Sequence, residues 1–461
     1  WCSEPKKIAE KNDILISVRA PVGPTNICPE KSCIGRGLAA IRAIRPIDFM
    51  FILYYLRSFE EQIASKGTGS TFEAISKRDL EELEIPLPPL PEQRILVTRV
   101  ESLLERVKKA KQELDKIPEI IKKFRQSVLK QAMSGRLTAD WRERHPDVEP
   151  ASEVLKRIQE ERLRRYEEEV KRAKAEGRKK PRKPKNLDVK PLDASELPEV
   201  PDGWVWCNLP SITENHDGRR IPIKASERKK MQGKYPYYGA SGIIDYVNRY
   251  IFDGDYLLIS EDGANLIYRS TPIAFCVSGK FWVNNHAHVL STEIGLPLKY
   301  LEHYFNSIDL SPFITGSAQP KLTQANLDRI PIPLPPLEEQ KEIVHRIETL
   351  FKFADEVEKQ VKEAQKQVEK ISQSILAKAF RGELTADFRY AVKNWGNLSI
   401  EERRRYLIAL PEDEREKVLY SDEFPIEPTS VLLERIRAER ERKKKERRRS
   451  KRKKSGQITL F

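Results

Sequence analysis

The chain has 461 residues, of which 33% are charged and 39% are hydrophobic, and its formal net charge is +14. This length predicts two to four domains, and the absence of any apolar run of about eighteen residues excludes a membrane-spanning helix. Five cysteines without a Cys-x-x-Cys pair are typical of reduced thiols in a cytoplasmic protein and exclude a disulfide framework.

Most of the positive charge lies in two runs. Residues 435–454 hold 14 Lys or Arg against 3 Glu, and residues 171–185 hold 9 against a single Glu. The two runs carry +11 and +8 of the total of +14, which leaves the rest of the chain at −5. A nucleic-acid surface on the folded domains must therefore be a local patch. The runs themselves fit solvated segments as well as segments that hold DNA phosphates.

The N-terminal region combines strand and helix signals. Residues 13–18 alternate like a strand, residues 34–44 fit a second strand, and residues 46–59 fit a buried helix. A Gly/Ser/Thr loop at 66–71 and a short helix follow, and that helix stops at the prolines from Pro86 onward. Because the sequence opens on Trp1, we expect the chain to be a fragment.

The chain repeats itself at an offset of 247 residues. IPLPPLPEQR at 85–94 returns as IPLPPLEEQK at 332–341, and LKQAMSGRLTADWRE at 129–143 returns as LAKAFRGELTADFRY at 376–390. A period this long indicates two copies of one unit, each with a variable region, a proline-rich hinge and a long helix. The first copy has fewer residues before its hinge than the second, so we expect the N-terminal part of its variable region to be missing.

Each hinge is followed by apolar residues spaced alternately three and four apart, which is the coiled-coil heptad. Two such helices in one chain are predicted to pair with each other, antiparallel, over about 60 Å. Pro118 should kink or split the first helix, and Gly135 and Gly382 should cap the two C-termini. The predicted seam includes Leu103, Val107, Leu114, Ile121, Leu350, Val357, Val361 and Val368.

Charged segments follow both helices. ASEVLKRIQEER at 151–162 resembles TSVLLERIRAER at 429–440, so the second copy carries about 31 extra residues around 391–421. We expect both segments to be solvated helices with frayed basic ends. Between them, residues 204–335 are rich in short apolar runs and turn signals, which favours a β-rich domain.

Catalytic motifs are absent from the sequence. It contains no GxxxxGK[ST], no GxGxxG and no Asn-Pro-Pro-Tyr motif. His286 and His288 lack further ligands at zinc spacing and are predicted to be satisfied loop or strand histidines. The pair Glu261–Asp262 fits acid–base chemistry no better than a turn. We therefore predict a binding and scaffolding chain with neither catalytic residues nor a metal.

Amide, hydroxyl, guanidinium and ammonium groups on loops are the groups that read DNA. Two such readers held apart by a coiled coil suit a target with two halves. In the second variable region the candidates are Arg219, Arg220, Lys224, Lys229, Lys230, Lys234, Tyr235, Tyr237, Tyr238, Asn284, Asn285, Gln319 and Lys321. In the first they are Arg19, Arg36, Lys66, Thr68, Ser70 and Thr71. The alternative for each is a solvated surface residue, and YPYYGASG also fits a core turn.

The doubled IPLPPLxEQ hinges, the heptad helices, LTADWRE and LTADFRY, KYPYYGASGIIDYV and AQPKLTQANLDRIPIPLP resemble the specificity subunit of type I restriction–modification enzymes (HsdS family). The resemblance covers about 1–145 and 200–390. It implies an α+β fold in which two mixed α/β target-recognition domains are joined by two conserved helices with pseudo-two-fold symmetry. The predicted divisions are 1–88 for the first recognition domain, 89–135 for the central helix, 136–203 for a linker, 204–335 for the second recognition domain, 336–382 for the distal helix and 383–461 for the tail.

The resemblance also implies a function and partners. Such a chain recognises a bipartite site in double-stranded DNA and carries two methyltransferase subunits, and restriction motor–nuclease subunits join for cleavage. S-adenosylmethionine, ATP and Mg²⁺ would belong to those partners, and the complex would be cytoplasmic. The competing hypothesis is a coiled-coil adaptor that binds only proteins, and it predicts that 204–335 shows no sequence preference for DNA.

The last five residues, QITLF, suggest a further partner. Gln457, Leu460 and Phe461 resemble peptides that dock on bacterial sliding clamps, in which a glutamine anchors and a Leu-Phe pair fills an apolar pocket. A hydrophobic tail that binds nothing, or one that folds back on the body, explains the same residues.

Overall fold

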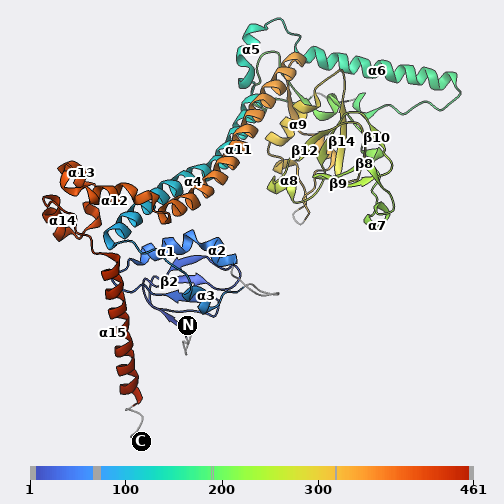
Figure 1. The fold of residues 1–461 in the computed structure, drawn as a ribbon. Coiled ribbons are helices and arrows are strands. Elements are labelled where there is room, and N and C mark those ends of the chain that lie inside the picture. The colour runs from blue at the N-terminus through green and yellow to red at the C-terminus, as the bar shows by residue number, and fades with distance from the viewer. Residues whose placement is uncertain (1–6, 66–73, 188, 190–191, 317–318, 456–461) are drawn as a thin grey trace. The chain divides into compact units, whose positions relative to one another are not determined.

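The computed structural model describes residues 7–65, 74–187, 189, 192–316 and 319–455. The chain divides into two compact units. Unit 1 combines Trp1–Lys116 with Val361–Phe461, and unit 2 is Ile117–Gln360 (Figure 1). None of the helices in the described residues is both long and apolar enough to cross a membrane.

The two heptad segments form two continuous helices of 44 residues each, α4 (Leu90–Met133) and α11 (Leu337–Phe380). The helical assignment of α4 runs through Pro118, so the predicted split is wrong. Beyond each helix the chain turns at a glycine in the left-handed region, Gly135 with φ of 71° and Gly382 with φ of 77°. Glycine adopts this conformation without the clash that a Cβ causes, which confirms the predicted C-caps.

Within each unit the two helices run antiparallel. In unit 1 the first turns of α4 share a core with the last turns of α11, and further along Gln365 donates a 2.8 Å hydrogen bond to Asp115. In unit 2 the last turns of α4 share a core with the first turns of α11, and Arg125 donates to Asp355 at 2.8 Å. The antiparallel pairing that the sequence predicts is therefore confirmed.

The predicted seam faces inward along both helices. All eight seam residues are at least half-buried, and Ile121 and Val361 are each only 6% exposed. A stripe that alternates between three and four residues stays on one face of a helix, because the helix turns once every 3.6 residues.

The two helix starts are held by one constellation of side chains, which occurs once in each unit. A buried glutamate near the start of one long helix accepts hydrogen bonds from a threonine and an arginine that follow the end of the other. The threonine hydroxyl lies 2.6 Å from the glutamate in both units. The two sets, 247 residues apart member for member, are Glu92, Thr385 and Arg389 in unit 1 and Glu339, Thr138 and Arg142 in unit 2. We call each set a helix clasp.

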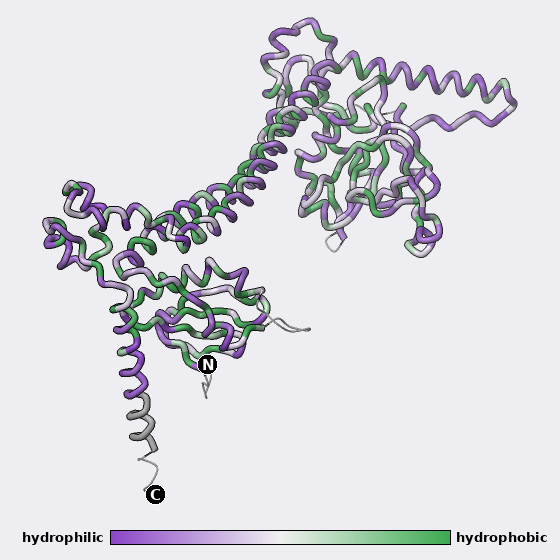
Figure 2. The backbone as a smooth tube through the Cα atoms, in the orientation of Figure 1, coloured by the Kyte–Doolittle hydropathy of each residue, from purple (hydrophilic) through white to green (hydrophobic). Residues whose placement is uncertain are grey.

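Unit 2 contains two four-stranded sheets. One is antiparallel with the order β12-β11-β14-β7, and the other has the order β10-β13-β8-β9 with β13 and β8 parallel. Apolar strand residues (green in Figure 2) and helix α9 (Leu298–Ser307) build the core. The strands are β7 (Thr213–Asn215), β8 (Gln232–Gly239), β9 (Gly242–Val247), β10 (Phe252–Asp253), β11 (Tyr256–Ser260), β12 (Ala274–Val277), β13 (Lys280–Val283) and β14 (Ala287–Thr292).

The proline hinge of unit 2 is a covered strand. β15 (Pro331–Leu334) pairs antiparallel with β6 (Val205–Asn208), with Ile332 opposite Cys207. The side chains of Ile332 and Leu334 are 0% and 1% exposed. The other short elements of unit 2 are α5 (Ala139–Arg144), α7 (Ala225–Arg228), α8 (Asn265–Tyr268) and α10 (Gln324–Leu327).

Helix α6 (Ala151–Ala175) is largely hydrophilic (Figure 2), yet its first half is docked on unit 2. Val154 and Ile158 are fully buried, and Arg162 lies 5% exposed with its Nε 2.7 Å from Glu293. The guanidinium of Arg162 also donates to three backbone carbonyls. The expectation of a solvated helix is therefore wrong for this half, because Val154, Ile158 and Arg162 are buried against unit 2.

Unit 1 contains a smaller sheet. Strand β2 lies between β3 and β5, as β11 lies between β12 and β14 in unit 2. Asp48 caps helix α1, whose apolar residues pack on this sheet, and Ser76 and Asp79 form a capping box at α3. The elements are β1 (Ile8–Ala9), β2 (Ile14–Ser17), β3 (Thr25–Ile27), β4 (Ser32–Cys33), β5 (Leu38–Ile41), α1 (Phe49–Ser58), α2 (Glu60–Ser65) and α3 (Lys77–Glu81).

The extra residues of the second copy form a small helical module in unit 1. Its core surrounds Trp395, Phe388 and Phe424, and Ile95 from the start of α4 belongs to the same core. The helices of the module are α12 (Ala386–Lys393), α13 (Ile400–Arg404) and α14 (Glu412–Leu419), and the basic α15 (Thr429–Ser455) follows it.

Candidate nucleic-acid interface

Unit 2 presents a basic surface at α7 and at the start of β8. Lys224, Lys229, Lys230 and Lys234 are all exposed, and none of them pairs with a carboxylate in the part of the chain that the structure describes. Arg228, between them, pairs with Asp245 of β9 at 3.0 Å and thereby ties α7 to the β8–β9 hairpin. The four lysines are therefore unpaired cations on a fixed support, which suits contact with phosphates.

The β8–β9 hairpin adds apolar and aromatic groups beside these lysines. Ile243, Ile244 and Tyr246 of β9 are about half exposed, and Tyr250 is 40% exposed. Tyr235 is half-buried, with Lys234 5.4 Å from its ring centre and Tyr250 packed edge-on against it. Exposed apolar groups next to cations offer contacts to base edges as well as to phosphates.

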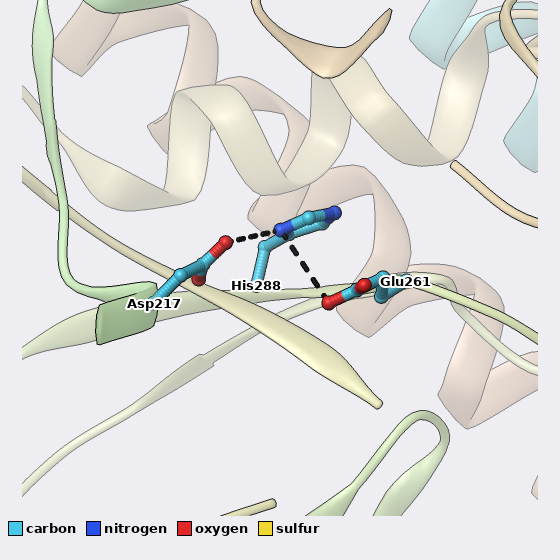
Figure 3. A group of neighbouring side chains, drawn as sticks. All are labelled: Asp217, Glu261 and His288. Atoms are coloured by element: carbon cyan, nitrogen blue, oxygen red, sulfur yellow. Dashed lines mark hydrogen bonds and ion pairs between the residues drawn. The ribbon is translucent and has the colours of Figure 1, made fainter. Parts of the chain in front are cut away.

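Three side chains from distant parts of the sequence meet beneath the neighbouring loops (Figure 3). His288 of β14 lies between Asp217 and Glu261, with its Nδ1 2.6 Å from Asp217 and 3.9 Å from Glu261. Its Nε2 is 2.8 Å from the carbonyl of Leu322. Each ring nitrogen of His288 therefore faces a hydrogen-bond acceptor, a carboxylate on one side and a backbone carbonyl on the other.

Two further cations complete this ion-pair cluster. Arg220 donates to Glu261 at 2.6 Å and lies 3.3 Å from Asp217, and Lys321 lies 3.1 Å from Glu261. The ligand atoms of Asp217, Glu261 and His288 lie within 4.8 Å of one another, which resembles a metal site. However, Arg220 and Lys321 already pair with the carboxylates, and the Nε2 of His288 faces the backbone carbonyl of Leu322. The cluster is therefore a set of ion pairs.

The two carboxyl groups of the cluster are held ionised. Burial raises the pKa of Asp217, but the hydrogen bond from His288 and the charges of His288 and Arg220 outweigh it, so the pKa is lowered. Burial likewise raises the pKa of Glu261, and the hydrogen bonds from Arg220 and Lys321, with the charge of His288, lower it below its ordinary value. The two carboxylates and the cations Arg220 and Lys321 thus stabilise one another around His288 in a partly buried site.

The ion-pair cluster fixes the loops that surround it. The backbone N–H of Glu261 donates to His286, and the N–H of Leu322 donates to Glu261. The loops at 284–286 and 319–321 are joined in this way to the end of β11. They present Asn285 and Gln319 to solvent, so these two predicted readers lie on loops that a rigid cluster supports.

Several predicted DNA contacts have structural roles instead. Tyr237 is 1% exposed and accepts a hydrogen bond from the backbone of Ile223, and Asn284 is 6% exposed and accepts one from the backbone of His286. These two predictions are corrected, because the side chains lie in the interior. Tyr238 is half-buried against Phe275 and Phe281.

The remaining predicted residues of unit 2 are partly committed to internal contacts. Arg220 belongs to the ion-pair cluster and is about 12% exposed, so it positions loops. Lys321 belongs to the cluster too, although its side chain is 49% exposed. Arg219 is exposed, donates to the carbonyl of Ile251 at 2.8 Å and lies over the ring of Phe252.

In unit 1 the predicted contacts Arg19 and Arg36 are exposed, on the loops after β2 and before β5. Lys66, Thr68, Ser70 and Thr71 lie outside the described residues, as do Gln457, Leu460 and Phe461. Among the residues that the structure describes, Arg19 and Arg36 do not come together with charged partners in one site.

Sequence reasoning missed several exposed groups of unit 2. Tyr246 lies in β9 and Arg249 follows it, and both are exposed, as is His286, with its Nδ1 2.9 Å from Asp262. Tyr268, at the end of α8, is 79% exposed. The alternation of GIIDYV over β9 was the available signal for Tyr246, because every second residue of an edge strand faces solvent.

Known proteins resemble this chain over most of its length. The family described as "Type I restriction modification DNA specificity domain" matches it twice, at residues 3–119 and 201–367. The chain belongs to this family of type I specificity subunits. The EcoDI specificity subunit of Escherichia coli is 30% identical over 363 residues, which are 74% of this chain and 71% of that protein. The EcoKI specificity subunit of Escherichia coli is 30% identical over 375 residues, 78% of this chain and 71% of that protein.

Solved structures show the same fold. A chain from the type I restriction–modification system, solved in work on its complex assembly and conformational transition, has a TM-score of 0.57 at 18% identity and covers 83% of this subunit and 85% of itself. The HsdS subunit of Thermoanaerobacter tengcongensis has a TM-score of 0.50 at 21% identity, covering 83% and 84%. The specificity subunit is α+β, with two mixed regions and two long antiparallel helices, as the sequence predicts.

The two family matches coincide with the two copies of the internal repeat, each of which includes a hinge and the start of a long helix. A specificity subunit is the DNA-recognition component of a type I restriction–modification system, and it works with methyltransferase and restriction subunits. It is not itself an enzyme.

Proposed function

We propose that unit 2 reads one half of a bipartite DNA site. The observation that carries this proposal is the ion-pair cluster of Asp217, Glu261 and His288, which supports two loops with exposed amides beside a basic helix. Rigid loops let amide groups meet base edges at fixed positions, and Asn and Gln read adenine in the major groove. Asn285 and Gln319 are the readers in this proposal. The lysines of α7 and Lys234 hold the phosphates and set the register.

The first recognition domain, at 1–88, would read the other half. Its exposed Arg19 and Arg36 are the candidate contacts among the described residues. The paired helices α4 and α11 would set the distance between the readers, because a B-DNA turn measures about 34 Å and a spacer of fixed length selects a fixed separation of half-sites. The division of the chain into recognition domains, spacer helices, linker and tail, with the bounds predicted from the sequence, is part of this proposal.

The partners follow from the same proposal. Two methyltransferase subunits would bind around the spacer helices, one for each copy of the repeat, and restriction motor–nuclease subunits would join for cleavage. S-adenosylmethionine would serve the methyltransferases, and ATP and Mg²⁺ would serve the motor, in the cytoplasm. The duplicated helix clasps support a two-fold arrangement, because they offer the same constellation at the start of each long helix.

Selection from random DNA tests the reading role. The subunit is purified with its methyltransferase and mixed with random duplexes, and the bound duplexes are sequenced. We expect a split motif. Asn285→Ala and Gln319→Ala should both relax the specificity in the half of the motif that unit 2 reads. The expected loss is about 1–3 kcal/mol of binding free energy per lost base contact. Lys229→Ala should weaken all sequences about equally and lower the salt dependence of binding. A motif that neither amide substitution changes would contradict the assignment of the readers.

We also propose that the C-terminal QITLF docks on a sliding clamp, with Gln457 as the anchor and Leu460 and Phe461 in an apolar pocket. The support for this proposal is the sequence alone. A clamp pull-down with the tail peptide tests it, using a Phe461→Ala peptide as the control. Equal retention of the two peptides would end the proposal.

A further inference from the structure

One exposed side chain of the 284–286 loop, that of His286, is held from one side by a carboxylate. The Nδ1 of His286 lies 2.9 Å from each carboxylate oxygen of Asp262. The side chain of Asp262 is only 15% exposed, whereas that of His286 is 46% exposed. In the described part of the chain nothing hydrogen-bonds to the Nε2 of His286. The imidazole is therefore anchored at one nitrogen, and the other is free for a ligand.

The backbone of His286 is fixed as well. Its N–H donates to the side-chain oxygen of the buried Asn284 at 2.8 Å, and its carbonyl accepts from the N–H of Glu261 at 2.9 Å. The residue is thus held at its N–H, at its carbonyl and at Nδ1. A side chain that is ordered before binding loses little conformational entropy when it meets a ligand. This is the preparation that a residue needs if it is to recognise a base.

The carboxylate of Asp262 stands on a segment that joins the two loops with exposed amides. Asp262 follows Glu261 of the ion-pair cluster, and its backbone forms a β-bridge with Lys321. Gly263 comes next, with φ of 109°, and its N–H donates to the carbonyl of Pro320 at 3.0 Å. Residues 261–263 are therefore hydrogen-bonded to both the 284–286 and the 319–321 loops. His286 shares this support with Asn285 and Gln319.

The carboxylate decides what the free nitrogen can do. An ionised carboxylate accepts hydrogen bonds and cannot donate them, so the ring proton belongs on the Nδ1 that faces Asp262. The neutral ring then presents Nε2 as an acceptor. In the major groove an acceptor finds donors on the amino groups of adenine and cytosine, whereas guanine and thymine present acceptors there. Such a histidine separates amino bases from keto bases.

A second histidine two residues further on shows the contrast. His288 also has an aspartate at its Nδ1, Asp217 at 2.6 Å, but its side chain is fully buried. Its Nε2 lies 2.8 Å from the carbonyl of Leu322. Both nitrogens of His288 therefore face groups of the protein, and the ring supports the loops from within. The same aspartate–histidine pairing leaves Nε2 available only at His286.

We propose that His286 is a specificity-determining residue, which accepts at Nε2 a hydrogen bond from the amino group of adenine or cytosine in the major groove. Asp262 is the positioning residue, because it fixes both the orientation of the ring and the place of its proton. This inference rests on the proposed reading function of unit 2, and it adds the class of base that one position of the half-site must hold.

Selection from random duplexes tests the reading role of His286. The full chain with its methyltransferase is used at about pH 8, above the ordinary pKa of an imidazole. We expect one position of the split motif to favour adenine or cytosine over guanine and thymine by about tenfold. His286→Ala should remove this preference and leave the other positions unchanged. His145→Ala removes another exposed histidine of unit 2, outside the reading loops, and should leave the whole motif unchanged.

The positioning role of Asp262 has a readout of its own, the protonation of the two ring nitrogens. Isotope-labelled histidine reports it by NMR in the full chain, and the signals of His286 are those that His286→Ala removes. At about pH 8 we expect a proton on Nδ1 and none on Nε2. Asp262→Asn supplies an amide that can also donate to Nδ1, so the ring should become a mixture of tautomers. The base preference should then fall to about threefold.

Three results would overturn the inference while the split motif, and with it the proposed function, stays in place. In the first, His286→Ala changes no position of the motif. In the second, the position that it changes favours guanine or thymine. In the third, the wild-type chain carries the proton on Nε2. A wild-type selection without any split motif would instead overturn the proposed function and this inference together.

Discussion

Two arginines at matching points of the repeat, Arg162 on α6 and Arg440 on α15, have opposite environments. Arg162 is 5% exposed and joined to Glu293 and three carbonyls, whereas Arg440 is exposed and has no ion pair among the described residues. The two helices have similar sequences, so the local sequence pattern is enough to predict that both segments are helical. The burial of the arginine depends on tertiary contacts, because the carbonyls and the carboxylate that Arg162 meets come from other segments of unit 2.

This comparison predicts the largest difference between matched variants. Arg162→Ala should destabilise unit 2 by about 3–5 kcal/mol, because it leaves the buried Glu293 with Arg165 alone and strips three backbone carbonyls of their donor. Arg440→Ala should change the stability of unit 1 by less than about 0.5 kcal/mol. Urea unfolding followed by hydrogen exchange at β14 and at β2 measures the two units separately. Equal losses in both units would contradict the contrast.

The second contrast lies at the start of the long helices. Ile95 of α4 is 2% exposed in the core of the helical module, whereas the matching Glu342 of α11 is half-buried and pairs with Arg346. Ile95→Ala should cost about 2–4 kcal/mol, and Glu342→Ala should cost less than about 1 kcal/mol. Proteolysis between α12 and α15 should increase only in the first variant. A module that stays resistant would show that Ile95 does not hold it.

The two helix clasps should differ by less. Glu339 is fully buried and accepts from Thr138, Arg142 and Trp204, so Glu339→Gln should cost about 2–3 kcal/mol. Glu92 has one partner fewer, and Glu92→Gln should cost about 1–2 kcal/mol. Thermal unfolding of the two variants side by side measures the difference. A larger loss for Glu92→Gln would argue that something other than the clasp holds unit 1.

Acid should destabilise the loops of unit 2 that the ion-pair cluster supports. This is the smallest of the four predicted effects. The pKa values of Asp217 and Glu261 are lowered in the folded chain, so their contribution to stability is complete above the pKa of the unfolded side chains, about 4, and is lost as the pH falls through the folded values. Exchange at the 284–286 and 319–321 loops should rise below about pH 4. In Asp217→Asn this dependence should be weaker, and an unchanged dependence would exclude Asp217 as a source.

Periodicity and repetition predicted the frame of the molecule well. The heptads located α4 and α11, Gly135 and Gly382 ended them, and the 247-residue offset placed matching hinges. The heptads and the glycine caps are local features, since each depends on residues within a few turns of one another, and the repeat needs only a comparison of the sequence with itself. At Pro118 the helix continues, which excludes the predicted split, and a kink at this residue stays a prediction.

The candidate interface was harder to predict, because its organisation depends on residues that are distant in sequence. Asp217, Glu261 and His288 come from three separate segments, so no spacing rule joins them. Burial also depends on tertiary packing, so the local sequence predicts DNA contacts at Tyr237 and Asn284 although both side chains are buried. The basic character of α7 was visible in the sequence, since exposed lysines need no partner to be recognised.

The central claim is that residues 204–335 choose one half of a split DNA site. The most direct measurement is to exchange this segment for the corresponding segment of another type I specificity subunit, express the hybrid with its methyltransferase, and map methylated adenines across the genome. The account predicts that one half of the motif changes while the other half and the spacing between them stay the same. An unchanged motif, or a contiguous one, would contradict it.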